Sequence, residues 1–315
     1  MISNIELRTS LSLGRKLAHA SSESEEFLVS LQKERPRGKD LRKWKGYYEE
    51  RFSRGLGEIE VIDLSPSKTT VLINRYSSGP MEAGIFTSSW ETATGKRHKF
   101  RWSESSKVLM VELNEDKLEV PSPRVINGRW PETIEKNDTD GHVDWEDIRE
   151  LDSGGWELTG ERKFILYRDL MLRFEDYSIH NIDTVRDSRI EDYKWIGVEE
   201  KRALWWTAVA DSSRQLFSDS GRHVMISGAE DWASISIRNL SLNGLGILSN
   251  PRLEIETGEI NARLLGCFHP AICGGILLGC WERSTGVKGR ITMNLESETL
   301  GINIVPNRVT INNHE

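Results

Sequence analysis

A short polar turn lies between two apolar runs in SISIRNLSLNGLGILS, residues 234–249. Asn239, Ser241 and Gly244 would supply an amide, a hydroxyl and a backbone that a ligand can approach closely. With arginines nearby, such a turn can hold phosphates or guanine edges, because the guanidinium fork suits both. The same residue types also form an ordinary tight turn. The sequence therefore leaves both interpretations open.

A basic stretch mixed with aromatic residues follows the first thirty residues. KERPRGKDLRKWKGYYEERFSR, residues 33–54, contains nine Lys or Arg residues and four acidic ones. Single-stranded nucleic acid is bound by such mixtures, since cations hold phosphates and rings stack on bases. The residues predicted to do so are Lys39, Arg42, Lys43, Trp44, Lys45 and Tyr47. The alternative is a solvated, partly helical arm that packs its aromatic residues on the next domain.

Three cysteines and one histidine lie close together in CFHPAICGGILLGC, residues 267–280. Four such ligands can hold zinc, but the spacing matches no C-x-x-C knuckle. Buried cysteine usually acts as a small apolar residue, so we expect no metal and no cofactor. The chain also lacks the G-x-S-x-G, H-E-x-x-H, P-loop and G-x-G-x-x-G motifs. We therefore predict that the protein is not an enzyme.

The elements that would position these residues follow a mostly strand-like pattern. We expect one early helix over 22–34 and strands at 58–64, 68–76, 97–102 and 107–113. Further strands are expected at 83–90, 163–174, 203–211, 222–227, 233–238, 252–256, 261–267, 274–281, 289–295 and 301–305. The one at 274–281 lies within the apolar run AICGGILLGCW. We detect no internal repeat of fixed period.

These elements predict a mainly β fold: an antiparallel sandwich or jelly-roll-like domain, preceded by a second strand-rich region and a helical, basic N-terminal arm. The predicted segments are the arm at 1–54, the strand-rich region at 55–120, an acidic linker at 121–160 and the β-sandwich at 161–310.

Composition limits the compartment and the partners. The 315 residues have a formal net charge of −7, which disfavours whole-surface attraction to nucleic acid but allows a local basic patch. Three cysteines indicate a reducing compartment. The start of the chain lacks the apolar run of a signal peptide, and no run of ~18 apolar residues is present. We expect an intracellular, cytoplasmic protein.

The turn at Asn239, Ser241 and Gly244 fits a [D/N]-x-S-x-x-G pattern and resembles the PilZ family of cyclic-di-GMP receptors. That resemblance implies a regulatory protein in which an R-x-x-x-R pair lies shortly upstream. Arg214 and Arg222 have a different spacing, and the R-x-x-x-R pair Arg97 and Arg101 lies far away in the sequence.

A second resemblance covers residues 200–285. There an expected strand ends in Asp211, and further expected strands follow after a polar interval. This order resembles the thirty-kilodalton superfamily of plant-virus movement proteins. The resemblance implies a jelly-roll-like fold, with Asp211 in a structural role that fixes the turn after its strand.

These patterns together favour a viral movement protein that binds viral RNA or its nucleocapsid and carries it from cell to cell through plasmodesmata. The partners implied are host membrane or plasmodesmal proteins. The sequence also leaves open whether the protein forms a homo-oligomer. The alternatives are a PilZ-like cyclic-di-GMP-binding regulator and a self-assembling viral matrix or structural protein.

Overall fold

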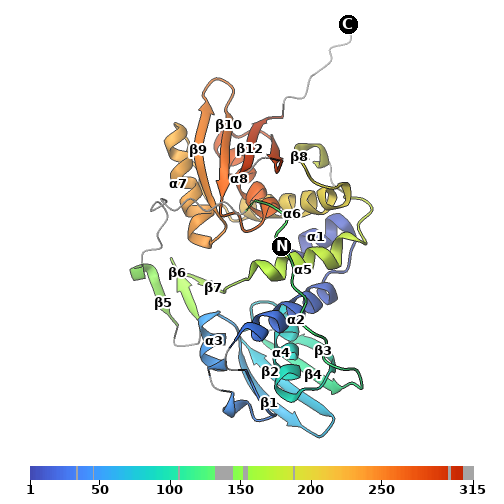
Figure 1. Cartoon of the computed structure of the whole chain (residues 1–315). Coiled ribbons are helices and arrows are strands. Elements are labelled where there is room, and N and C mark those ends of the chain that lie inside the picture. The colour runs from blue at the N-terminus through green and yellow to red at the C-terminus, as the bar shows by residue number, and fades with distance from the viewer. Residues whose placement is uncertain are drawn as a thin grey trace. The chain divides into compact units, whose positions relative to one another are not determined.

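The computed structural model describes residues 1–32, 35–44, 46–105, 107–131, 145–151, 155–186, 189–296 and 299–307 (Figure 1). These residues form eight α-helices and twelve strands, and the strands make three separate sheets. Helix exceeds strand, and the described residues form no sandwich. The prediction of a mainly β, jelly-roll-like fold is therefore wrong.

The chain divides into two compact units. Unit 1 contains Met1–Leu11, Gly128–Val143 and Ser178–Glu315, whereas unit 2 contains Ser12–Asn127 and Asp144–Tyr177. Each unit combines segments that the division by composition kept apart. The start of the expected arm, for example, forms helix α1 (Ile2–Thr9) of unit 1.

Unit 2 is a four-stranded antiparallel sheet with helices packed on one face. Its sheet has the order β1-β2-β4-β3, and helix α2 packs on helix α4. The elements of this part are α2 (Gly14–Leu31), α3 (Tyr47–Ser53), β1 (Glu58–Leu64), β2 (Lys68–Asn74), α4 (Gly79–Thr94), β3 (His98–Ser105) and β4 (Val108–Glu115). A small sheet and most of one helix complete the unit: β5 (Ile148–Glu150), β6 (Trp156–Leu158), β7 (Glu161–Lys163) and α5 (Arg168–Ile179), whose last two residues belong to unit 1.

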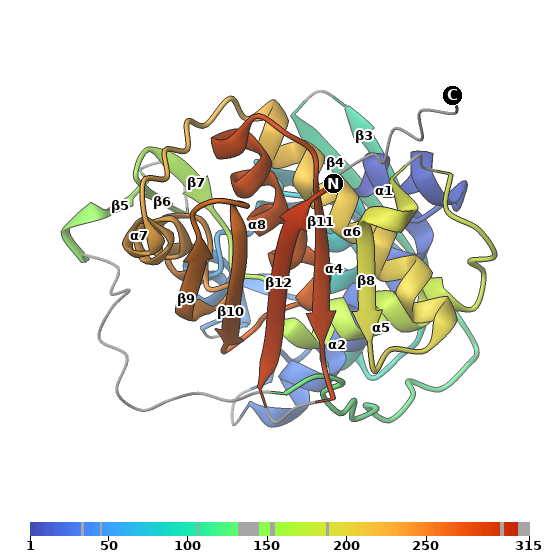
Figure 2. The same ribbon diagram turned by 90° about the horizontal axis from the view of Figure 1, so that it is seen from above.

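Unit 1 has a five-stranded sheet of order β8-β11-β12-β10-β9, in which only β8 runs parallel to its neighbour. Figure 2 shows the five strands side by side, with α6 and α8 behind them. Its remaining elements are β8 (Tyr193–Ile196), α6 (Glu200–Asp219), α7 (Ala229–Asn239), β9 (Ile247–Glu254), β10 (Glu259–Leu265), α8 (Pro270–Thr285), β11 (Gly289–Asn294) and β12 (Leu300–Pro306).

The two units repeat one topology. Each has two strands, a helix and two more strands, with a preceding helix packed on the central one. In the central helices, Trp281 follows Trp90 by 191 residues, and Glu282 follows Glu91 by the same interval. Both carboxylates accept a backbone N–H from the start of the next strand, at 2.6 Å for Glu91 and 2.9 Å for Glu282. The repeat was not detected in the sequence because few side chains are shared.

The two central helices were expected to be strands. The runs at 83–90 and 274–281 lie within α4 and α8, which are buried over most of their surface. A helix that is apolar on every side lacks the 3.6-residue period, so it resembles a buried strand in sequence. The signals of a helix were nevertheless present, because each begins with a proline in its first turn and ends before a left-handed glycine. Likewise 163–174, 203–211 and 233–238 lie largely in α5, α6 and α7.

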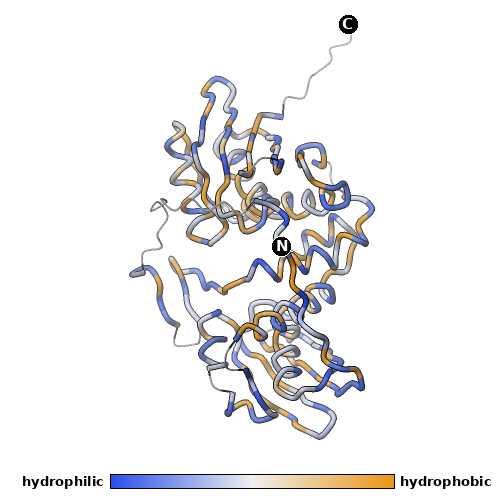
Figure 3. Tube along the Cα trace, in the orientation of Figure 1, coloured by the Kyte–Doolittle hydropathy of each residue, from blue (hydrophilic) through white to orange (hydrophobic). Residues whose placement is uncertain are grey.

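Within each unit the two long helices approach each other at a glycine. A Cβ added at Gly84 would lie 2.1 Å from the carbonyl oxygen of Ala18, and one at Gly275 would lie 2.1 Å from that of Ala210. Neither glycine can carry a side chain without parting two helix backbones. Apolar and polar residues alternate along the strands that these helices cover (Figure 3).

Candidate functional site

The predicted nucleic-acid arm is folded into the core of unit 2. Trp44 and Tyr47 are 2 % and 6 % exposed and pack in the apolar cluster around Trp90, so neither ring is free to stack on a base. The Trp44 indole donates a hydrogen bond to the carbonyl oxygen of Gly38 at 2.9 Å. The alternative interpretation expected these aromatic residues to be packed rather than free, and they do pack, but within the unit that contains them.

The basic residues of that segment are partly neutralised. Asp40 forms ion pairs with Arg42 at 2.9 Å and with Lys43 at 3.8 Å, and Lys39 donates to the Pro66 carbonyl. Lys45 lies outside the described residues. The stretch therefore presents exposed cations without the aromatic platform that its sequence suggested.

The turn at 239–244 follows a helix rather than a strand. Asn239 is buried at the end of α7, where its amide donates to the Ile235 carbonyl at 2.9 Å. Ser241 begins a short 3-10 turn, and Gly244 has the left-handed φ of 66° that ends it. These contacts are those of a helix end that turns into β9, and the Asn239 amide is not presented to a ligand.

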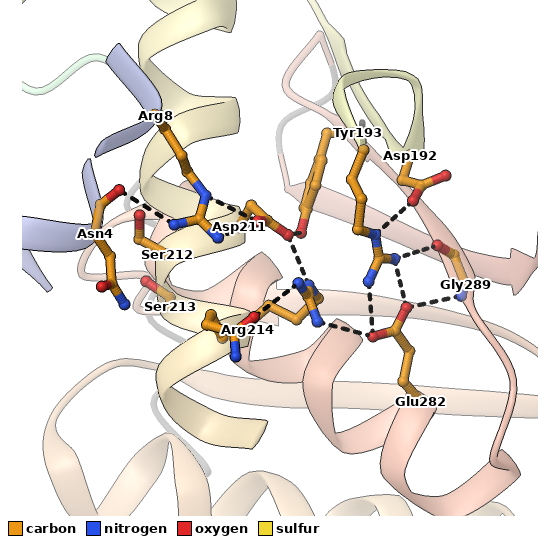
Figure 4. Close-up of polar contacts among 12 residues, drawn as sticks. Asn4, Arg8, Asp192, Tyr193, Asp211, Ser212, Ser213, Arg214, Glu282 and Gly289 are labelled. Atoms are coloured by element: carbon orange, nitrogen blue, oxygen red, sulfur yellow. Dashed lines mark hydrogen bonds and ion pairs between the residues drawn. The ribbon is translucent and has the colours of Figure 1, made fainter. Parts of the chain in front are cut away.

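Asp211 lies inside helix α6, not after a strand, so the order that resembled movement proteins is not formed. Its buried carboxylate accepts hydrogen bonds from Arg8 at 2.8 Å, Tyr193 at 2.8 Å and Arg214 at 2.7 Å (Figure 4). These partners come from α1, β8 and α6 itself. Asp211 therefore joins three elements of unit 1.

The network continues from Arg214 to Glu282 on α8. Glu282 accepts hydrogen bonds from Arg214 at 3.3 Å and from Arg189 at 3.1 Å, and Arg189 also donates to Asp192 at 2.7 Å (Figure 4). Burial and the Asp211 carboxylate raise the pKa of Tyr193 well above its usual value, so its hydroxyl keeps its proton. Burial alone would lower the pKa of Arg189, but the bonds to Glu282 and Asp192 raise it.

Every charge of this network has a partner. Three arginines face three carboxylates with short contacts, and Arg290 adds a longer ion pair to Asp192 at 3.7 Å. Such buried pairs fix the arrangement of the elements that carry them, and removing one member is costly. We assign the network to the folding of unit 1 rather than to ligand binding.

The outer face of the unit 1 sheet differs, because Lys194, Arg252 and Arg263 form no ion pair among the described residues, whereas Arg290 lies 3.7 Å from Asp192. The strand register aligns one polar residue from each of the five strands in a row: Lys194, Thr292, Asn303, Asn261 and Arg252. The neighbouring outward row contributes Asn294, Gly301, Arg263 and Ser249. The two rows hold hydrogen-bond donors, and the flanking row of the same face adds Glu259 and Glu254. The Glu259 carboxylate accepts hydrogen bonds from the Asn261 amide at 3.1 Å and from the Asn303 amide at 2.7 Å.

A hollow of about 450 Å³ lies on this face over β9 and β10. It is lined by Asn250, Pro251, Arg252, Asn261, Ala262 and Arg263. Arg252 and Arg263 are both exposed, and neither forms an ion pair within the described part of the chain. Two guanidinium groups beside the Asn250 amide can hold a phosphate and a hydrogen-bonding group attached to it.

These residues were missed in the sequence because they are scattered. Arg252 and Arg263 stand in two short strands without neighbouring basic residues, and only strand pairing brings them to one face. The alternation in NARLLG, residues 261–266, was the one available signal, since it places Asn261 and Arg263 on the same side of a strand.

The cysteines are buried. The Sγ atoms of Cys267 and Cys273 lie 3.8 Å apart, and burial raises the pKa of the Cys280 thiol to about 12. Within the residues described, no three His, Cys, Asp or Glu side chains are grouped so that they could hold a metal ion.

No family profile and no curated protein matches this sequence. Helices long and apolar enough to cross a membrane are absent from the described ranges.

Proposed function

We propose that the protein is a non-enzymatic binding protein that holds single-stranded RNA on the outer face of the unit 1 sheet. The observation that carries this proposal is the hollow over β9 and β10, where Arg252 and Arg263 are exposed and form no ion pair among the described residues. Arginine forks bind phosphates, and the amide of Asn250 matches the donors and acceptors of base edges, whereas the Asn261 amide is held by Glu259 and Asn303.

The extent of the face favours a polymer over a small anion. The row from Lys194 to Arg252 crosses five strands, which places its ends roughly 19 Å apart at the usual strand spacing. The two aligned rows contain no aromatic side chain, so binding through phosphates and polar groups is expected rather than base stacking. Such binding tolerates many sequences.

The role of a viral movement protein remains a proposal, and RNA binding on this face would serve that role. RNA held on the sheet is compatible with carriage of viral RNA or nucleocapsid through plasmodesmata. Because Asp211 lies within a helix, the resemblance that suggested this role contributes no support from the structure.

The test is fluorescence anisotropy with a labelled single-stranded RNA of mixed sequence, titrated from 50 to 200 mM salt. The double variant Arg252→Glu, Arg263→Glu should weaken binding by about tenfold or more. Loss of two phosphate contacts should also reduce the slope of log K against log salt by about 1.4. Arg238→Glu, exposed on α7 and outside the hollow, is the matched control and should bind like the wild type.

Three results would contradict the proposal. The first is no RNA binding at 50 mM salt. The second is loss of binding with Arg42→Ala, Lys43→Ala but not with the sheet variant, which would return the site to the basic stretch. The third is equal affinity for polyglutamate, which would identify an acidic protein surface as the ligand.

A further inference from the structure

The edge strand β1 of unit 2 leaves apolar side chains exposed. All seven of its residues are exposed or only half-buried. Val61, Ile62 and Leu64 are 38 %, 53 % and 46 % exposed, whereas Ile59 at the other end packs partly on the core cluster. A strand that buries so little apolar area gains little from its own unit, so an additional covering partner is expected.

The register gives β1 two chemically distinct faces. Ile59 and Val61 pair with the buried Ile73 and Val71, so they point toward the helix side of the sheet. The opposite face presents three acids, Glu58, Glu60 and Asp63. Glu58 has a partner in Arg75 at 3.4 Å, whereas Glu60 and Asp63 form no ion pair within the described residues.

The corresponding edge of unit 1 is protected. Helix α7 packs on β9, and the Ser236 hydroxyl accepts the backbone N–H of Leu248 at 2.8 Å. Pro251 removes another N–H from that strand, and Asn250 has a left-handed φ of 51°. In unit 2 the helix at this place in the chain is α3, which is only seven residues long, and β1 has no proline.

We propose that β1 is a docking edge for an extended segment of another protein in which apolar residues alternate with Lys or Arg. The segment would add a strand beside β1, as edge strands do in β-augmentation. Its apolar side chains would cover Val61 and Leu64, and its cations would face Glu60 and Asp63 across the new strand pair. A second copy of β1 is a poor occupant, because antiparallel self-pairing would bring like charges together.

The probe is a labelled peptide of sequence KVKIKVKI, compared with EVEIEVEI and with KKVVKKII, which has the same composition without the alternation. Binding is measured by anisotropy, and amide hydrogen exchange locates the site. The alternating basic peptide should bind about tenfold or more tightly than the other two, since each cross-strand pair adds to affinity. It should also slow exchange of the β1 amides, a change that docking elsewhere would not produce.

Variants separate the contributions of charge and apolar area. Glu60→Lys, Asp63→Lys should reverse the preference, so that EVEIEVEI binds more tightly than KVKIKVKI. Val61→Ser, Leu64→Ser should weaken binding of the basic peptide. The control is Ile255→Ser, Glu256→Lys, which changes exposed residues of the β9–β10 turn and should leave peptide binding unchanged.

Several outcomes would overturn the proposal: equal binding of the three peptides, unchanged exchange in β1, or no reversal by the charge variant. A wild-type dimer that Leu64→Ser dissociates in sedimentation would identify a second copy as the occupant. None of these results depends on RNA, so the two proposals can fail separately.

Discussion

The close approach of α6 and α8 gives a sharp prediction for Gly275→Ala. In most helix interiors this change stabilises a protein, because alanine is favoured over glycine by about 1 kcal/mol. Here the added Cβ would lie 2.1 Å from the Ala210 carbonyl oxygen and 2.9 Å from the Ser213 Cβ. Ordinary C···O contacts need about 3.3 Å, so the helices must part by roughly 1 Å.

The cost of that displacement exceeds the gain. Forcing extra methyl groups into packed cores costs about 1–3 kcal/mol, and more when backbone must move rather than a side chain. We expect a net loss of about 2 kcal/mol in the free energy of unfolding of unit 1. Gly84→Ala should destabilise unit 2 in the same way, because its added Cβ would meet the Ala18 carbonyl at the same distance.

The neighbouring glycine provides a matched control. At Gly274 an added Cβ would meet mainly the sulfur of Met293 at 2.7 Å, and that flexible side chain can move. Unit 2 already has Ala83 at the corresponding position. Calorimetry should therefore show Gly274→Ala close to the wild type, and Gly275→Ala with one transition lowered. Wild-type stability for Gly275→Ala would refute the reasoning.

Three further outcomes follow. Asp211→Asn should cost unit 1 roughly 3–5 kcal/mol in denaturant unfolding, because Arg8 and Arg214 lose the buried negative charge that both contact. Exposed Asp219→Asn should cost under about 0.5 kcal/mol. Equal effects of the two changes would contradict a structural network. Burial raises the pKa of Glu91 to about 7, above its unfolded value of 4.5. The folded state therefore holds this proton more tightly, so the contribution of Glu91 to stability is full below pH 4.5 and is lost as the pH rises to 7. Glu91→Gln should remove that pH dependence from urea titrations, and an unchanged profile would count against it. The Cys280 thiol should resist a thiol reagent at pH 8 until urea unfolds the chain, and rapid native labelling would show that it is accessible.

Sequence patterns located the four strands of the unit 2 sheet and most of α2. The expected strands at 58–64, 68–76, 97–102 and 107–113 correspond to β1, β2, β3 and β4. The early helix expected at 22–34 overlaps α2 over residues 22–31, and α2 begins eight residues earlier. Alternation is a local property, so a single strand can be read from it without knowing its neighbours.

Helices α4 and α8 were not predicted, because burial on every side removed the amphipathic pattern from their sequences. α4 and α8 are enclosed on all sides, so their sequences lack a polar face and resemble strands. Once both were misassigned, the fold class changed from mixed to mainly β. The prolines and glycines at their ends indicated helices, but the apolar runs were given more weight.

The candidate site was not predictable for a different reason. Arg252 and Arg263 are separated by a hairpin, and Lys194 reaches the same face only through the parallel pairing of β8 with β11. Conversely, Trp44 and Tyr47 appeared in a basic segment, and only tertiary packing shows that they belong to the core. Placement on a face depends on contacts between distant residues, which local spacing does not contain.

The position of α1 in unit 1 affects the order of folding during synthesis. Arg8 contacts Asp211 across 203 residues of chain, and the whole of α2 to β4 is made in between. The ribosome therefore releases α1 long before it has made helix α6, on which α1 packs. In the meantime the segments of unit 2 that are made after α1 can already collapse. Completion of unit 1 should be the slow step, since long loops must close before its contacts form.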